Sequence, residues 1–258
     1  MTVILEDRVS RAALLARRLS VFSFVLFILS ALAMRRQVMN PPEFVVLLGL
    51  VLVLALFALF AAGLGWRRVW SFGDRGGGSL AVAILFCAIV LSPFVVAGVF
   101  FLIEPPISDV STDLGDPPKF VVAQKARTAG MNPIRPISSE EADLQRAAFP
   151  AVSGRRYGAS IDHVLEIVRQ TMNAEGWRIS SEPSLAEDQT EYEIEAVARP
   201  ALLPFPSDIV VRLRDEGDST YVDMRSASRY GRFDLGSNAA RIRSFLSLLD
   251  VAMASEAR

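Results

Sequence analysis

Three long apolar stretches near the N-terminus constrain the fold of this chain more than any other feature of its sequence. Residues 44–65 contain no charged side chain over 22 positions, and residues 80–103 contain none over 24. A helix needs about 20 apolar residues to cross the hydrocarbon layer of a bilayer, so both stretches predict transmembrane helices. Residues 19–34 give only 16 such positions, and this span reaches full length if Arg17 and Arg18 extend their side chains toward the interface.

The first stretch has an alternative interpretation as a cleaved signal peptide. Two arginines precede the apolar run, and residues 31–33 (Ala-Leu-Ala) have the small side chains of a cleavage site. Arg35 and Arg36 follow directly and disfavour cleavage. The predicted topology of the rest of the chain is the same under both interpretations.

The arginines of the N-terminal region are unequally distributed between the two ends of the predicted helices. Only Arg35 and Arg36 lie in the loop between the first and second helices. Seven others lie in the N-terminal tail and in the loop between the second and third helices: Arg8, Arg11, Arg17, Arg18, Arg67, Arg68 and Arg75. Because basic residues accumulate on the cytoplasmic side, we predict a multi-pass bacterial inner-membrane protein with a cytoplasmic N-terminus and a periplasmic C-terminal domain.

The chain after residue 103 has the composition of a water-soluble domain. It carries 18 basic and 24 acidic residues, whereas residues 1–103 carry nine arginines and four acids. An acidic domain is a poor candidate for binding nucleic acid, which requires a basic surface. The chain has a single cysteine, Cys87, and a single histidine, His163. These low counts exclude a disulfide framework, and we take them to exclude a zinc site and a Ser-His-Asp triad as well. No cofactor is therefore expected, and the absence of charge within residues 44–65 and 80–103 argues against a transporter.

Residues 104–150 predict a semi-rigid linker. Seven prolines interrupt this segment, and proline pairs favour extended chain. Asp109, Asp113 and Asp116 lie between them, but the spacing of a calcium-binding loop is absent, so we interpret them as solvated. The predicted organisation is a three-helix transmembrane region at 1–103, a Pro-rich linker at 104–150 and a soluble α+β domain at 151–258.

Within the soluble domain the hydrophobic pattern predicts the order α-β-β-β-β-α. Helical periodicity covers residues 160–174, with Ser160 as the N-cap, and residues 238–254. Strand patterns with turn residues between them cover residues 177–182, 192–199, 209–214 and 220–230. Short connections between strands imply an antiparallel sheet. We expect four antiparallel strands covered on one face by two helices.

The strand alternation assigns opposite characters to the two faces of this sheet. Ile194, Val211 and Met224 share the face expected under the helices. The other face receives mostly charged side chains, namely Glu191, Glu193, Glu195, Arg212, Arg214, Asp223 and Arg225. We interpret this charge ladder as a solvated surface, and a binding surface is the alternative.

The junction between the last strand and the last helix holds the densest group of candidate ligand-binding residues. They are Arg225, Ser226, Ser228, Arg229, Asp234, Asn238 and Arg241. If Asp234 or Ser237 caps the helix, the three arginines converge near its N-terminus, where backbone N–H groups and guanidinium groups bind anions. The structural alternative is that Asp234 pairs with one of these arginines and stabilises the turn.

The same junction resembles the signature of the domain-of-unknown-function 1499 family. The matching run is Arg225-Ser226-Ala227-Ser228-Arg229-x-Gly231-x-x-Asp234-x-Gly236-x-Asn238-x-x-Arg241-Ile242. Thr112-Asp113 followed by Asp116-Pro117-Pro118-x-Phe120 matches the upstream pattern of that family, and the resemblance covers roughly residues 107–250. It implies a domain that often follows N-terminal membrane helices and has no established activity.

Together these observations favour a membrane-anchored periplasmic binding or scaffolding domain over an enzyme. The expected partners are the lipid bilayer and either an anionic ligand or an envelope protein, and nucleic acid is not among them. One alternative is an accessory subunit of a larger membrane complex. Another is a cofactor-free enzyme that uses Ser226, Ser228 and Asp234 together with the arginines.

Overall fold

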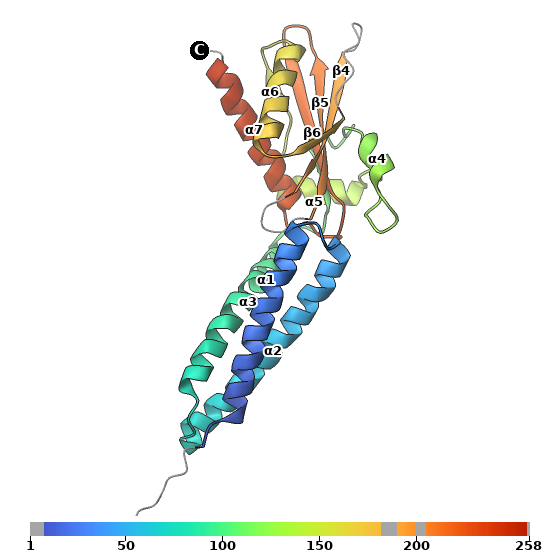
Figure 1. Ribbon diagram of the computed structural model, residues 1–258. Helices are drawn as coiled ribbons and strands as arrows, with labels where there is room; N and C mark the ends of the chain where they lie inside the picture. The colour runs from blue at the N-terminus through green and yellow to red at the C-terminus, as the bar shows by residue number, and fades with distance from the viewer. Residues whose placement is uncertain (1–7, 182–189, 200–204, 257–258) are drawn as a thin grey trace, which may run out of the picture. The chain divides into compact units, whose positions relative to one another are not determined.

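The computed structural model describes residues 8–181, 190–199 and 205–256, which form two compact units (Figure 1). The first unit ends at Val99 and the second begins at Phe100. Within the described residues the first unit is built from helices, whereas the second combines helices with one antiparallel sheet. The chain is therefore a mixed α+β protein, as the sequence predicts.

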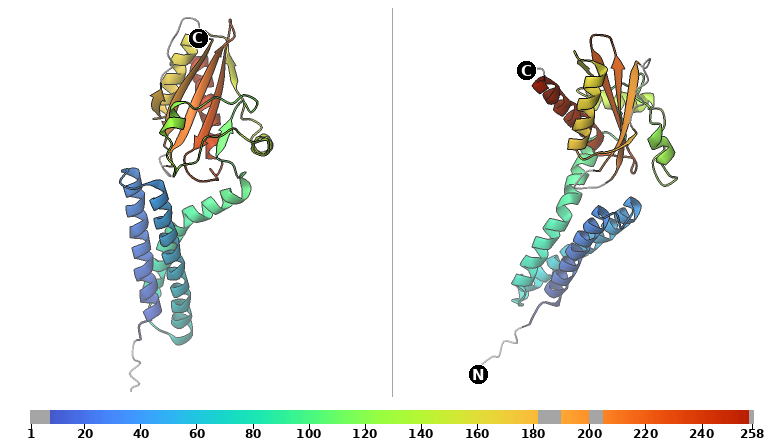
Figure 2. Two further views of the ribbon diagram at one scale, coloured as in Figure 1. Left: turned by 90° about the vertical axis from the view of Figure 1, so that its right-hand side faces the viewer. Right: turned by 45° about the horizontal axis from the view of Figure 1, so that its top comes forward.

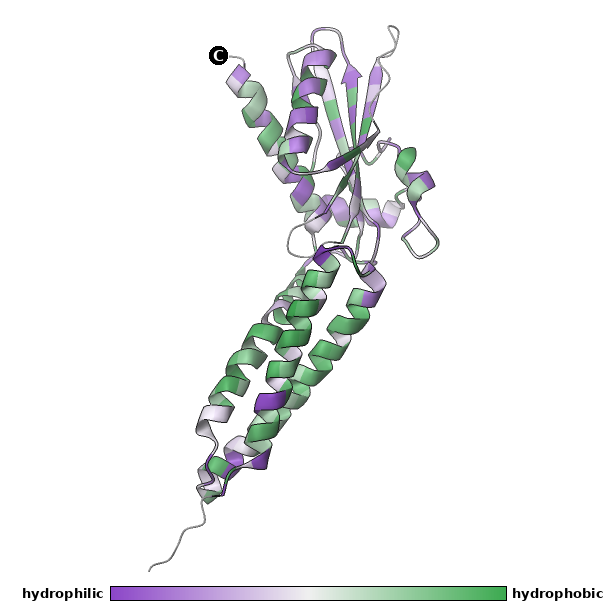
Figure 3. Ribbon diagram, in the orientation of Figure 1, coloured by the Kyte–Doolittle hydropathy of each residue, from purple (hydrophilic) through white to green (hydrophobic). Residues whose placement is uncertain are grey.

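The first unit is built on α1 (Arg11–Arg35), α2 (Pro41–Phe72) and α3 (Gly77–Ile103). All three helices are long and apolar enough to span a membrane. Figure 3 shows hydrophobic residues over most of their length. They contain the three predicted apolar stretches, so these predicted helices are confirmed.

Small residues allow α1 and α2 to approach each other closely. Ala58 is fully buried, and Ala62 is buried one helical turn later. A Cβ atom added to Gly65 would lie 2.9 Å from the backbone nitrogen of Ala13. The hydroxyl of Ser23 also donates to the carbonyl of Val51, at 3.0 Å. Close packing of small side chains and hydrogen bonds between helices are the main sources of association in lipid.

The start of α1 is joined to the loop between α2 and α3. The backbone N–H of Ser10 donates to the carbonyl of Arg75 at 2.9 Å, and the N–H of Arg75 donates to the carbonyl of Arg8 at 2.8 Å. The two arginine-rich segments therefore lie at the same end of this unit.

The described residues of the second unit form a six-stranded antiparallel sheet. Its strands are β1 (Asp109–Ser111), β2 (Arg155–Tyr157), β3 (Arg178–Ser181), β4 (Glu191–Ala198), β5 (Ser207–Asp215) and β6 (Thr220–Ser228). Their order is β1-β6-β5-β4-β3, and β2 also pairs with β6. The four predicted strands are confirmed, but the predicted strand number is wrong. The two additional strands have three residues each, which is too short for a recognisable alternation.

Two helices cover one face of the sheet, as predicted. Figures 1 and 2 show α6 (Ile161–Ala174) and α7 (Ser237–Glu256) on the same side of the strands. The buried core between them includes Val168, Phe245 and Met224. Burial of this apolar face at about 25 cal/mol per Å² supplies most of the stability of such a domain.

The segment predicted as a linker differs from that expectation. Residues 104–150 contribute strand β1 together with α4 (Val122–Ala126) and α5 (Ser139–Ala148). Figure 1 shows α4 beside the sheet, opposite α6 and α7, and Phe120 is buried there. Proline favours extended chain, but extended chain packs on a sheet as readily as it spaces two domains. The segment is therefore part of the folded unit.

Most of the charged face of the sheet is correspondingly buried, and its interpretation as a solvated surface is wrong there, although Glu191 is exposed and Arg214 is half-buried. Asp208 and Asp223 are 0% exposed, Arg212 is 2% exposed and Glu195 is 3% exposed. Alternation correctly places charged and apolar residues on opposite faces. It carries no information on whether a distant segment covers the charged one.

Candidate functional site

Strand β6 separates the predicted site residues into two groups. The side chains of Ser226 and Ser228 point toward α7, where Arg241 and Asn238 lie. Arg225 and Arg229 belong to the opposite face and pair with carboxylates there. Because neighbouring residues of a strand point to opposite faces, the expected convergence of the three arginines is wrong.

Asn238 is the centre of the group under α7 and is fully buried. Its Oδ1 accepts hydrogen bonds from the hydroxyl of Ser226 at 2.8 Å and from Nη1 of Arg241 at 2.7 Å. Its Nδ2 donates to the hydroxyl of Ser228 at 2.9 Å and to the carbonyl of Ser108 at 3.0 Å. One side chain thus joins β6, α7 and the residue before β1.

Asp234 caps the start of α7, as predicted for it. Its two carboxylate oxygens accept from the backbone N–H groups of Gly236, at 2.9 Å, and Asn238, at 2.8 Å. Burial raises the pKa of Asp234, against the effect of these donors. Burial also lowers the pKa of Arg241, against the effect of the nearby charge of Asp234. Arg241 donates hydrogen bonds to Ser226 and Asn238. Asp234 accepts backbone N–H groups at the start of α7, so it acts as a cap in place of the alternative pairing with an arginine.

On the opposite face, Arg225 pairs with Asp109 of β1. The guanidinium group donates twice to the carboxylate, at 2.9 and 2.8 Å, and also to the carbonyls of Pro118 and Arg135. Arg225 is buried, and its partners all come from the segment expected as a linker. This pair therefore attaches residues 109–135 to the sheet.

Asp208 of β5 binds two arginines at once. Its Oδ1 accepts from Nε and Nη2 of Arg229, at 3.0 and 2.6 Å, and its Oδ2 accepts from Nε of Arg127 at 2.8 Å. Arg127 also donates to the carbonyls of Asn132 and Ala227, at 2.7 and 3.0 Å. A buried carboxylate with two buried guanidinium partners leaves one positive charge in excess at this point.

The remaining buried charges hold the same segment in place. The carboxylate of Glu195 accepts hydrogen bonds from the backbone N–H groups of Val121, Val122 and Ala123, at 2.7 to 2.8 Å. It thereby caps the start of α4. Arg212 donates to Asp223 on β6. Arg212 also binds Asp113 and Asp116, two of the aspartates considered as calcium ligands. These carboxylates have arginine partners, and no group of metal-ligating side chains is found among the described residues.

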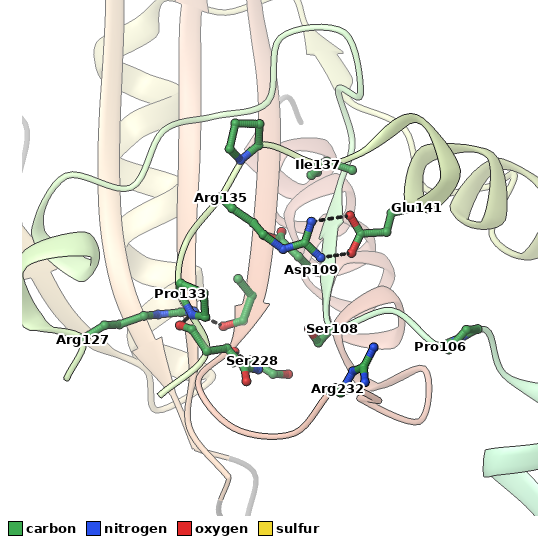
Figure 4. Close-up of a pocket in the computed structure, with 13 residues that line it drawn as sticks. Pro106, Ser108, Asp109, Arg127, Pro133, Arg135, Ile137, Glu141, Ser228 and Arg232 are labelled. Atoms are coloured by element: carbon green, nitrogen blue, oxygen red, sulfur yellow. Dashed lines mark hydrogen bonds and ion pairs between the residues drawn. The ribbon is translucent and has the colours of Figure 1, made fainter. Parts of the chain in front are cut away.

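A pocket of about 240 Å³ lies where this segment meets the end of β6. Arginines line it from three parts of the chain, namely Arg127, Arg135 and Arg232, and its acidic residues are Asp109 and Glu141 (Figure 4). Of the seven predicted site residues only Ser228 contributes to its wall. At about 30 Å³ for each water molecule in the liquid, the pocket has the volume of about eight waters.

The charges around this pocket do not cancel. Arg135 forms a double hydrogen bond with Glu141, at 3.0 and 2.5 Å, and Figure 4 shows this pair at the pocket. Asp109 is neutralised by Arg225. Arg232 is exposed and has no hydrogen-bond or ion-pair partner among the described residues. The pocket therefore presents one unpaired guanidinium group next to the positive excess at Asp208.

Sequence reasoning missed most of this pocket. Arg127 and Arg135 lie in the segment interpreted as a linker, and Arg232 lies between the two halves of the motif without belonging to it. One signal was available, because a strand face with several charges must either remain in water or find opposite charges elsewhere. The aspartates at 109, 113 and 116 are those opposite charges.

The sequence comparisons agree with the boundaries of this second unit. The family described as "Protein of unknown function (DUF1499)" matches residues 109–249, more than half of the chain. The match begins at β1 and ends within α7, so it includes the segment that covers the charged face. A search of curated proteins found no match.

Proposed function

The chain belongs to the DUF1499 family, whose function is unknown, and from this premise we propose that its second unit is a membrane-anchored domain that binds a small anionic ligand. The observation that carries the proposal is the unpaired Arg232 guanidinium group at a pocket that Arg127 and Arg135 also line. Guanidinium groups bind carboxylates and phosphates through paired hydrogen bonds. A soluble anion with one or two carboxylate or phosphate groups therefore fits the chemistry of this pocket.

The distribution of arginines supports a periplasmic location for this domain. The arginine-rich tail and the arginine-rich loop lie at one end of the helical unit, joined by the hydrogen bonds between Ser10, Arg75 and Arg8. Basic ends remain in the cytoplasm. With three spans, the chain that follows α3 lies on the other side of the inner membrane. The proposed ligand is then an anion of the cell envelope.

Binding is favoured over catalysis by the state of the candidate nucleophiles. Ser226 is fully buried, and its hydroxyl donates to Asn238. The hydroxyl of Ser228 accepts from the same asparagine. A serine nucleophile requires a neighbouring base. Among the described residues, neither hydroxyl hydrogen-bonds to a histidine or a carboxylate. The group under α7 thus resembles a structural network more than an active site.

Replacing Arg232 by alanine is expected to weaken anion binding about tenfold, the loss that corresponds to one charge-assisted hydrogen bond of roughly 1.4 kcal/mol. Isothermal titration of the full chain in a neutral detergent, with citrate and with inorganic phosphate as probes, measures this change. Arg146→Ala is the matched control, because Arg146 is exposed on α5, pairs with Asp143 and does not line the pocket. Equal affinities for both variants would contradict the proposed pocket.

Replacing Glu141 by glutamine is expected to raise the affinity for the same probes about threefold, since an exposed ion pair is worth up to about 1 kcal/mol. Partial burial raises the pKa of Glu141, but hydrogen bonds from Ser138 and Arg135 outweigh it and keep the pKa below its ordinary value. Glu141 is therefore charged at neutral pH and competes with a ligand for Arg135. Glutamine removes this charge and still forms the capping box of α5.

The neighbouring Glu140→Gln variant is the control for this prediction. Glu140 lies in the same helical turn and does not line the pocket. It loses the same charge at almost the same place. A threefold gain in both variants would indicate a general electrostatic effect and would count against a site at Arg135.

A further inference from the structure

A second basic pocket lies in the helical unit, between the start of α1 and the end of α2. Its volume is about 400 Å³, and it is lined by Arg11, Ala12, Leu64, Arg67, Arg68 and Phe72. Three guanidinium groups thus share one groove with two large apolar side chains. This combination differs from the pocket of the second unit, whose arginines are accompanied by acidic residues.

The arginines of this groove are largely without protein partners. Within residues 8–181, 190–199 and 205–256, Arg11 and Arg67 form no hydrogen bond or ion pair through their side chains. Arg68 approaches Asp74 only to 3.9 Å, and its side chain is 62% exposed. Several neighbouring guanidinium groups repel each other unless an anion neutralises them. The groove therefore favours an anionic occupant.

The position of the groove along α2 indicates which anion is available to it. The charge-free part of α2 ends at Trp66, and Arg67 and Arg68 follow within about 2–3 Å along the helix axis. Trp66 and Trp70, in the same part of the helix, are exposed, and their rings stack on each other with centroids 6.1 Å apart. Exposed tryptophans at the end of an apolar helix are typical of the headgroup region of a bilayer. The groove thus lies at the depth of lipid phosphates.

We propose that this groove binds the headgroup of an anionic phospholipid. Arg11, Arg67 and Arg68 hold the phosphate, and Leu64, which lies on the apolar side of the two α2 arginines, contacts the first part of an acyl chain. Basic pockets between transmembrane helices on the cytoplasmic side recognise lipid headgroups in this manner. The site depends on the helical unit alone and is independent of the anion pocket proposed for the second unit.

Tryptophan quenching tests this site once the reporter lines the groove. Trp66 and Trp70 are replaced by phenylalanine and Leu64 by tryptophan, because Leu64 lines the groove whereas Trp66 and Trp70 do not. The third natural tryptophan, Trp177, is buried in the core of the second unit. The full chain is reconstituted in phosphatidylcholine vesicles that contain brominated phosphatidylglycerol or brominated phosphatidylcholine. Stronger quenching by the anionic lipid measures its preference for the groove. Both leaflets contain the probe, so the orientation of the protein does not affect the result.

The double variant Arg11→Gln/Arg67→Gln is expected to reduce this preference about tenfold or more, since each basic residue near a membrane surface contributes roughly 1 kcal/mol. Arg35→Gln/Arg36→Gln is the matched control, because it removes two charges from the opposite end of α1. The control is expected to retain the preference. Equal losses in both variants, or no loss in the first, would overturn the proposal.

Inorganic phosphate distinguishes a lipid from a soluble anion as the occupant. Excess phosphate is expected to reduce the preference no more than chloride at the same ionic strength, because a bilayer-anchored headgroup is present at high local concentration. A specific displacement by phosphate would assign the groove to a soluble anion and contradict the lipid site. Neither result depends on whether Arg232 binds a ligand, so the two proposals fail separately.

Discussion

Replacing Asp208 by alanine is expected to destabilise the second unit by about 3–5 kcal/mol, the cost of removing one partner from a buried ion pair. The carboxylate is 0% exposed and accepts hydrogen bonds from both Arg127 and Arg229. Its removal leaves two guanidinium groups on a covered sheet face. Because such domains are stable by only about 5–15 kcal/mol in total, the loss is a large part of that stability.

Urea unfolding of the full chain in neutral detergent micelles measures this effect. Trp177 stacks on Phe245 in the core of the second unit at 4.9 Å, so its fluorescence reports unfolding there once Trp66 and Trp70 are replaced by phenylalanine. Asp218→Ala is the control, because Asp218 is exposed in the turn between β5 and β6. If Asp208→Ala does not accumulate, Asp208→Asn keeps the shape and one acceptor, and it is expected to cost more stability than the control and less than Asp208→Ala. Unfolding midpoints equal to that of the control would show that the buried pairs contribute nothing.

Replacing Asn238 by alanine is expected to cost about 2–4 kcal/mol, because several buried polar groups each lose a hydrogen bond at once. The hydroxyl of Ser226, the carbonyl of Ser108 and the guanidinium group of Arg241 all lose a hydrogen bond. The affected groups lie under α7, where water does not replace the lost partners. The same Trp177 fluorescence assay reports the change.

Asn173→Ala is the matched control for this variant, since Asn173 is an exposed asparagine of α6. Alanine in place of an exposed helical asparagine is expected to be neutral or slightly stabilising. Anion titrations provide the second measurement. If Asn238→Ala abolished citrate binding while its unfolding midpoint stayed unchanged, the motif around Asn238 would be a ligand site and the structural interpretation would be wrong.

The local elements of this protein were predictable because each is encoded by a contiguous pattern. Uninterrupted apolar runs specify α1, α2 and α3, and helical periodicity specifies α6. Strand alternation correctly placed Ile194 and Met224 against the helices and Arg212 on the other face. The cap at Asp234 followed from its position before a periodic segment. All of these signals act over a few residues, where backbone geometry and side-chain spacing decide.

The tertiary structure alone decided which charges are buried and what surrounds the pocket. Asp109 and Arg225 are separated by 116 positions in the sequence, and Asp208 and Arg127 are separated by 81. No periodicity relates such pairs, and a proline-rich segment has the same composition whether it lies in water or on a sheet. Burying a charge is favourable only where its partner is also present, and that partner is found only once the chain has folded back on itself.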